Sequence, residues 1–176
     1  MADSYRLTVL KRLTSLLEGT TVTPFTGLTL PPTLAGLVYR GRGRFGDDSP
    51  DTMLSILEAP RAGGGIYTSD DEGRKETWTL LIQGWCPEDH VNPSDPIYSL
   101  LDDVERRLDR VNRRSVNTGQ PTYPDDFMLG AGLNGDKYLI SKFQVNPGTV
   151  RPPTENISSK CWFYIAVQVD LARIAP

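Results

Sequence analysis

The sequence is poor in the residues that most often carry enzyme chemistry or bind metal ions. It has two cysteines, Cys86 and Cys161, and a single histidine, His90. Two cysteines do not make a disulfide framework, and both lie in apolar stretches, so we expect them to pack as small hydrophobic side chains in a reducing compartment. Cys86 and His90 share a loop but form no paired ligand motif, so no metal site is predicted. A G-x-S-x-G nucleophile elbow is also missing, and we predict no catalytic residue.

Long apolar runs and a basic charge excess are missing as well. No stretch approaches the roughly 18 apolar residues that a membrane-spanning helix needs, and the first residues lack the apolar core and cleavage site of a signal peptide. We therefore expect a soluble protein, made in a cytoplasm, with no membrane contact. The formal net charge is −3, whereas duplex-binding domains usually carry a clear basic excess. Any DNA contact would have to come from a local patch.

Glycine and proline, in contrast, are plentiful. The 176 residues include 16 glycines and 14 prolines. They fall in discrete stretches between periodic segments, which predicts long loops on a compact body and not general disorder. The length suits one hydrophobic core, so we expect residues 1–176 to form a single domain.

Two helices are predicted from the spacing of apolar residues. Residues 4–18 place leucines on one helical face, with Ser4 as the N-cap and Gly19 as the stop. The second helix begins at Ser94 or Asp95 and shows the clearest helical periodicity. Acidic residues precede basic ones at i, i+4 spacing along this helix, which predicts the pairs Asp102–Arg106, Asp103–Arg107 and Asp109–Arg113.

Strands are predicted over residues 34–40, 51–60, 76–85, 136–145 and 160–171. The second range is ambiguous, because prolines bound it and a short helix would also fit; we favour a strand. The apolar run of the last range is almost continuous, which indicates a strand covered on both faces. Neighbouring strands are hairpin-like, and the helices are too few for βαβ alternation. The order therefore predicts an α+β fold: a mixed or mainly antiparallel sheet with two helices packed on one face and long loops.

The stretch YRGRGRFGDDSP contains Gly41, Gly43 and Gly46 at the spacing of a dinucleotide-binding turn. That function needs a helix to open at the third glycine, so that its amide groups face a pyrophosphate. Asp47 and Asp48 follow directly and place negative charge where the phosphate would lie. A nucleotide-binding enzyme that uses the Gly41–Gly46 turn stays the weakest alternative, and no cofactor is predicted.

Arginines in this stretch and at the end of the second helix are the candidate contact residues. The aspartates beside the first group cancel much of its positive field. We therefore interpret the stretch as a turn between two strands whose arginines project toward another protein, with DNA binding as the alternative. Cations are favoured at a helix C-terminus, so the second group indicates a solvated or subunit-contacting face. The predicted assembly or lumen contacts are Arg40, Arg42, Arg44, Phe45, Asp47, Asp48, Arg110, Arg113 and Arg114.

The order of these segments resembles that of the bacteriophage tail terminator proteins, which are small ring-forming subunits on top of a phage tail tube. An amphipathic helix (SYRLTVLKRLTSLLEG) precedes a strand and a charged turn. A short apolar strand between prolines (SPDTMLSILEAP) and a tryptophan-containing strand (ETWTLLIQGW) follow. An acid-and-arginine helix (DPIYSLLDDVERRLDRV) then leads to the closing strands. The resemblance is one of pattern and spans most of the chain.

The resemblance implies a homohexameric ring that caps the tail tube, ends tail polymerisation and offers a joining surface to the head. Its partners would be further copies of the chain, the tail tube protein and a head connector or neck protein, with non-specific contact to passing DNA. It implies a virion protein of the tail-neck region, made in the host cytoplasm, with neither enzyme activity nor a cofactor. The alternative within this class is a head-closure or connector protein of the phage neck.

Overall fold

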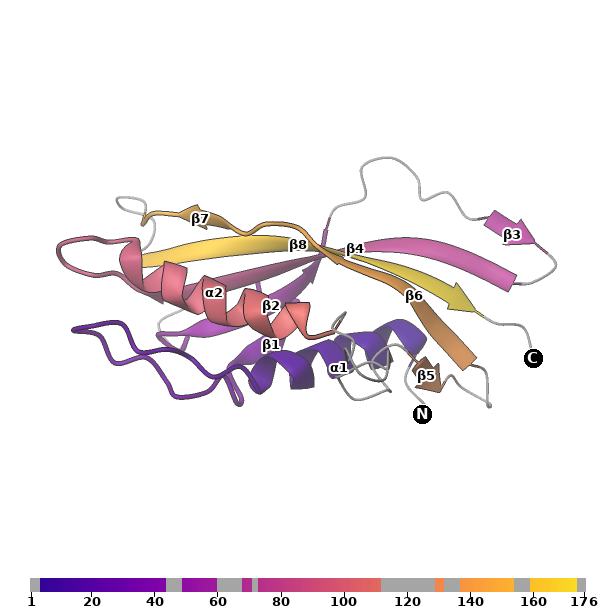
Figure 1. The fold of residues 1–176 in the computed structure, drawn as a ribbon, viewed down its shortest axis with the longest axis horizontal. Helices are drawn as coiled ribbons and strands as arrows, with labels where there is room; N and C mark the ends of the chain where they lie inside the picture. The colour runs from indigo at the N-terminus through magenta and orange to yellow at the C-terminus, as the bar shows by residue number, and fades with distance from the viewer. Residues whose placement is uncertain are drawn as a thin grey trace, which may run out of the picture.

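Helices and strands follow one another in the computed structural model in an order close to the predicted one (Figure 1). The structure describes residues 4–43, 49–59, 68–70, 73–111, 129–131, 137–153 and 159–173. The helices are α1 (Tyr5–Glu18) and α2 (Asp95–Asp109). The strands are β1 (Val38–Arg40), β2 (Met53–Glu58), β3 (Thr68–Asp70), β4 (Gly73–Pro87), β5 (Leu129–Ala131), β6 (Lys137–Val145), β7 (Thr149–Arg151) and β8 (Lys160–Arg173).

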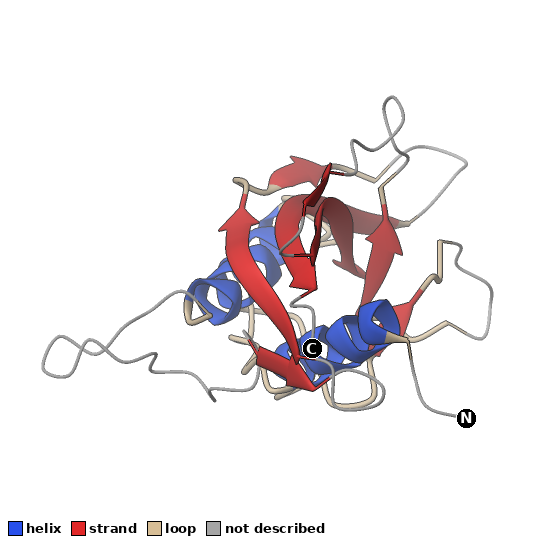
Figure 2. Ribbon diagram, turned by 90° about the vertical axis from the view of Figure 1, so that its right-hand side faces the viewer, coloured by secondary structure: helices blue, strands red, loops and turns tan. Residues whose placement is uncertain are grey.

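The strands form one mixed sheet in the order β1-β2-β4-β8-β6-β5, with β3 paired to β4 and β7 paired to β8. The long central pair joins β4 to β8 in antiparallel register, from Lys75 opposite Ala172 to Pro87 opposite Lys160. Both helices lie on the same side of the sheet, which curves over them (Figure 2). α1 contacts β1 and β5, the two edge strands, so both edges of the sheet are flanked by a helix. The predicted α+β fold is confirmed.

Residues 51–60, the ambiguous segment, contain strand β2 as favoured, and β2 pairs with β1, but not in the hairpin-like direction that was predicted. β1 and β2 are parallel, with Val38 opposite Leu54 and Arg40 opposite Ile56. Two parallel neighbouring strands need a crossover connection, which carries the chain back to the end of the sheet at which the first strand began. The turn predicted between these two strands is therefore a crossover connection over residues 41–52.

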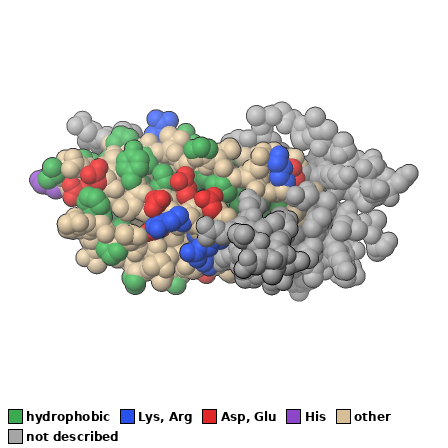
Figure 3. Space-filling view, in the orientation of Figure 1, with side chains coloured by type: hydrophobic (Ala, Val, Ile, Leu, Met, Phe, Trp, Pro, Cys, Tyr) green, Lys and Arg blue, Asp and Glu red, His purple; other side chains and the backbone are tan. Residues whose placement is uncertain are grey.

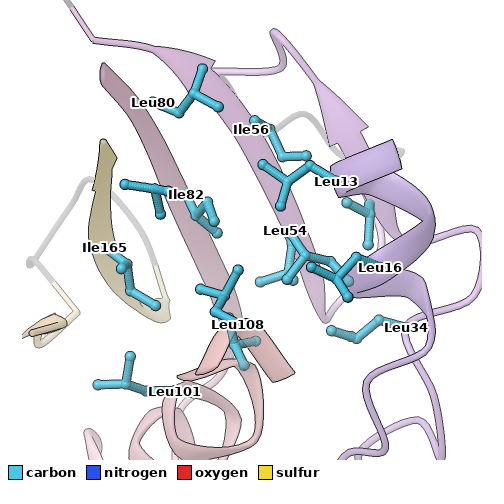
Figure 4. Close-up of a cluster of buried hydrophobic side chains, with 14 of the residues drawn as sticks. Leu13, Leu16, Leu34, Leu54, Ile56, Leu80, Ile82, Leu101, Leu108 and Ile165 are labelled. Carbon is cyan, nitrogen blue, oxygen red and sulfur yellow. The ribbon is translucent and has the colours of Figure 1, made fainter. Parts of the chain in front are cut away.

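The core lies between the helices and the inward face of the sheet (Figure 4). α1 begins as predicted, because the Ser4 side chain caps it by accepting a hydrogen bond from the backbone N–H of Leu7. Leu13 and Leu17 of α1 are fully buried, and so are Ile97 and Leu108 of α2. Each such side chain contributes about 1.5–3 kcal/mol when it leaves water. The inward side chains of the sheet that meet the helices are Leu54, Ile56, Leu80, Ile82, Phe163, Ile165 and Val167.

Gly84 of β4 lies on this inward face, where the strand alternation otherwise places large apolar side chains. It is opposite Leu54 on one side and Phe163 on the other. A Cβ atom at this position would overlap the Phe163 ring and lie 2.8 Å from Leu54 Cδ2. Because glycine has no Cβ, it leaves the space that the Phe163 ring occupies in the core.

Asp103 of α2 attaches the segment that follows α1. Its side chain is only 3% exposed. The carboxylate accepts hydrogen bonds from the Thr23 backbone N–H and from Thr23 Oγ1, the latter at 3.0 Å, and it pairs with Arg106. The predicted pair Asp102–Arg106 is confirmed at 3.1 Å. Arg113 of the third predicted pair lies outside the described residues.

The two cysteines face each other across the central strand pair. Cys86 and Cys161 are directly opposite in register, both are free and buried, and their Sγ atoms are 3.4 Å apart. The prediction that they pack as small buried side chains is confirmed. The hydrogen bond with Cys161 and burial raise the pKa of the Cys86 thiol well above its usual range.

Cys86 makes stability depend on pH in the alkaline range, whereas the same hydrogen bond lowers the pKa of the Cys161 thiol. An unfolded thiol ionises near its ordinary pKa of 9.0, whereas buried Cys86 stays protonated. The stability that Cys86 contributes is therefore present below that pH and decreases above it. Above about pH 9 the Cys161 thiol is ionised in both the folded and the unfolded chain, so the remaining pH dependence comes from Cys86. In urea unfolding, we expect the stability difference between wild type and the double variant Cys86→Ala, Cys161→Ala to decrease between about pH 9 and about pH 10.5. A difference that stays constant over this range would contradict the assignment.

Candidate functional site: the outer face of the sheet

The structure describes three of the predicted contact residues: Arg40, Arg42 and Arg110. Arg110 lies at the C-terminal end of α2, beside a surface pocket. The remaining predicted contacts lie outside the described residues; they are Arg44, Phe45, Asp47, Asp48, Arg113 and Arg114.

Arg40 and Arg42 lie back against the chain. Arg40 Nη1 donates a hydrogen bond to Thr14 Oγ1 of α1 at 2.9 Å. The guanidinium carbon of Arg42 lies 4.7 Å from the centroid of the Tyr39 ring, and Arg42 Nη2 donates to Ser49 Oγ at 2.8 Å. The predicted projecting arrangement is therefore wrong for these two side chains, because they fasten the crossover to its surroundings. Their part in assembly stays a prediction.

The structure describes Gly41 and Gly43 of this stretch, whereas Gly46 lies outside the described residues. Gly41 has a φ of +75°, in the left-handed region that favours glycine. Residues 49–52, which lead into strand β2, are not helical. The described part of the stretch therefore gives no support to a dinucleotide-binding turn, which needs a helix after the third glycine.

A better candidate surface is the face of the sheet that points away from the helices, here called the outer face. On β8 the odd-numbered residues from Cys161 to Leu171 are buried, whereas the even-numbered residues from Trp162 to Asp170 are half-buried. The prediction that both faces of this strand are covered holds for the inward side chains, whereas the outward side chains are only partly covered. Cross-strand register extends this face over β2, β4, β6 and β7.

One end of the outer face is aromatic. Here Trp162 is opposite both Trp85 and Arg151, and Tyr164 is opposite both Gln83 and Thr149. The Trp162 and Tyr164 rings have centroids 6.0 Å apart and planes inclined by 37°. We call Trp85, Trp162, Tyr164, Thr149 and Arg151 the aromatic end.

Tyr164 ties this end together. Hydrogen bonds with Thr149 and Arg151, together with the positive charge of Arg151, lower the pKa of Tyr164. These contacts link the Tyr164 side chain on β8 to the neighbouring strand β7. Beside them, Trp85 and Met53 are buried although they point away from the helices and lie outside the main core cluster. The aromatic end therefore rests on a second, smaller apolar layer.

The opposite end of the outer face is polar. Gln168 is opposite Thr79 and Gln144. One step further along the strands, Asp170 is opposite Thr77 and accepts a hydrogen bond from its hydroxyl at 2.8 Å. We call Thr77, Thr79, Lys142, Gln144, Gln168 and Asp170 the polar end. The composition of the outer face thus changes from aromatic and arginine to amide and hydroxyl along the strands.

This composition suits protein contact. Tryptophan, tyrosine and arginine are the residues that most often dominate the binding free energy of protein interfaces, because they bury large areas and still offer hydrogen bonds. Among the described residues, no group of three or more His, Cys, Asp or Glu side chains is placed to hold a metal ion. Neither helix in the described chain is long and apolar enough to cross a membrane. No protein-family model matches this sequence, and no curated protein matches it.

Proposed function

We propose that this protein is a structural subunit of the phage tail terminator class. It would form a ring that caps the tail tube, ends tail polymerisation and provides the surface on which the head is joined. The observation that carries the proposal is the aromatic end of the outer face. Among the described residues, the two helices fill the other side of the sheet, and the outer face is a broad surface that they leave open to a partner.

A ring needs one heterologous interface that repeats until it closes. The outer face would be one half of this interface, and it would meet a different surface of the neighbouring copy. Its two ends have separate roles in this arrangement. Trp162, Tyr164 and Arg151 would supply the desolvated centre of the contact, and the polar end would form its wet rim.

The test removes two side chains of the aromatic end that lie outside the main core cluster. The variant Tyr164→Ala, Arg151→Ala should fold normally but associate about 30-fold more weakly or worse, since a hot spot contributes about 2 kcal/mol. Association is measured by analytical ultracentrifugation and by counting capped ends of purified tail tubes in electron micrographs. Tail tubes are included because some ring subunits assemble only on their target.

The matched control is Gln144→Ala, Gln168→Ala at the polar end of the same face. This variant should retain both association and capping, because rim contacts contribute little. Normal capping by the aromatic-end variant would refute the proposed interface.

The runner-up function is a head-closure or connector subunit of the phage neck. The two functions differ in the component that the protein binds: a terminator binds the tail tube, whereas a head-closure or connector subunit binds the portal or another connector protein. A terminator should bind purified tail tubes in the absence of heads. Binding to portal or connector complexes, without binding to tail tubes, would favour the runner-up.

A further inference from the structure

A second candidate site lies where the C-terminal ends of α1 and α2 meet. A surface pocket of about 180 Å³ opens there. Figure 3 shows basic side chains gathered over the end of α2, with acidic side chains beside them. The pocket is lined by Gly19, Thr20, Thr21, Thr23, Asp103, Arg106, Arg107 and Arg110.

The acidic group of the pocket already has its partners. The Asp103 carboxylate accepts hydrogen bonds from Thr23 and pairs with Arg106. Arg106 also pairs with Asp102 at 3.1 Å. Two further arginines, Arg107 and Arg110, line the same pocket.

The Arg107 side chain contacts the end of α1 at two places, Leu16 and Gly19. Its Nε donates a hydrogen bond to the carbonyl oxygen of Leu16 at 2.7 Å, which satisfies a carbonyl in the last turn of α1. Its guanidinium also lies against Gly19, where a Cβ would collide with it. The chain thus fixes one cation at the pocket wall. Arg110 is exposed, and its side chain has no ion pair within the part of the chain that the structure describes.

Thr20 supplies an independent indication of a ligand. Thr20 is only 2% exposed. Its Oγ1 is buried and has no hydrogen-bond partner among the described residues. Leaving a buried hydroxyl unpaired costs free energy, and native proteins rarely leave one so. This hydroxyl belongs to a residue of the pocket wall, next to Thr21 and close to the arginines.

We propose that this pocket binds a phosphate group. A phosphate presents several acceptor oxygens, and guanidinium groups together with threonine hydroxyls are donors that match them. Arg107 would be the preset donor, Arg110 would close over the anion from the solvent side, and the Thr20 hydroxyl would gain its missing partner. The phosphate could be free phosphate or a phosphate of a DNA backbone. This inference does not depend on the proposed ring.

The test titrates the isotope-labelled protein with inorganic phosphate at constant ionic strength and follows the NMR signals of the Thr20 and Thr21 amides. A separate titration uses a short DNA duplex. We expect saturable shifts with phosphate and none with sodium chloride. The variants Arg110→Ala and Thr20→Val should each weaken binding by about tenfold, as expected for the loss of a hydrogen bond to a charged group. The exposed Lys142→Ala on β6 is the matched control and should bind like wild type.

The two titrations separate the sources of the phosphate. Saturable binding of inorganic phosphate that Arg110→Ala weakens about tenfold supports a site for a free phosphate group. Binding of the duplex that is equally sensitive to Arg110→Ala, without saturable binding of inorganic phosphate, supports a contact to the DNA backbone. Shifts that sodium chloride reproduces, or binding that both variants leave unchanged, would overturn the proposal.

Discussion

Replacing Gly84 with alanine is expected to lower the free energy of unfolding by about 3 kcal/mol, near the upper end of what overpacking a core costs. The added methyl group would overlap the Phe163 ring and approach Leu54. Neither side chain can move aside easily, because both are fully buried in the main cluster. The measurement is urea unfolding of wild type and variant, followed by circular dichroism.

Two further variants isolate the cause. Gly43→Ala is the control, because a Cβ at Gly43 has no heavy atom within 4 Å, and it should change stability by about 0.5 kcal/mol or less. Combining Gly84→Ala with Phe163→Leu removes part of the ring that collides. The double variant should therefore be more stable than the sum of the two single changes predicts. Strict additivity would show that the two residues do not share this space.

Asp103→Ala is the second large change, with an expected loss of about 2–3 kcal/mol. The substitution removes the acceptor of both Thr23 hydrogen bonds and one partner of Arg106. Because these contacts attach residues 20–33 to α2, the loss should appear locally first. Hydrogen exchange of the amides in that segment should accelerate more than exchange in β4 and β8.

Asp102→Ala is the matched control one residue away. It removes the other carboxylate that pairs with Arg106, but the Asp102 side chain is 68% exposed. Exposed ion pairs contribute little, so we expect a loss of about 0.5 kcal/mol or less. Equal effects of the two variants would refute the assignment of Asp103 as the anchor of the segment.

The elements that could be predicted from sequence are those whose signal is local. Both helices were predictable because their signals lie within a short stretch of sequence. These signals are the apolar period and the Ser4 cap of α1, and the strong apolar period of α2. The long strands β4 and β8 have enough residues for β-branched and aromatic side chains to indicate an extended chain. The short strands β3, β5 and β7 exist because a long strand lies beside them, and three residues carry no period of their own.

The contacts of the arginines depended on distant residues and could not be predicted. Arg40 bonds to Thr14, which belongs to a helix earlier in the chain. Asp103 is bonded to Thr23 and Arg106, whereas helical spacing predicted Arg107 as its partner. The continuous apolar run of β8 did not show that Trp162 and Tyr164 lie on the outer face and are only half-buried. The pairing of β8 with β4 and β7 is needed to show which side chains of this strand point away from the core.

The pairing of β4 with β8 has a consequence for how the chain folds. Trp78 pairs with Val169, and Cys86 pairs with Cys161. In the sequence, all of α2 and β6 therefore come between β4 and β8, the two strands of the central pair. Pairings between distant segments slow folding, because a large loop must close before any contact forms. While the chain is being synthesised, β4 lacks this neighbour until the ribosome has released β8. We therefore expect the sheet to form only after synthesis has passed β8, with α2 available earlier as a local helix against which the sheet can condense.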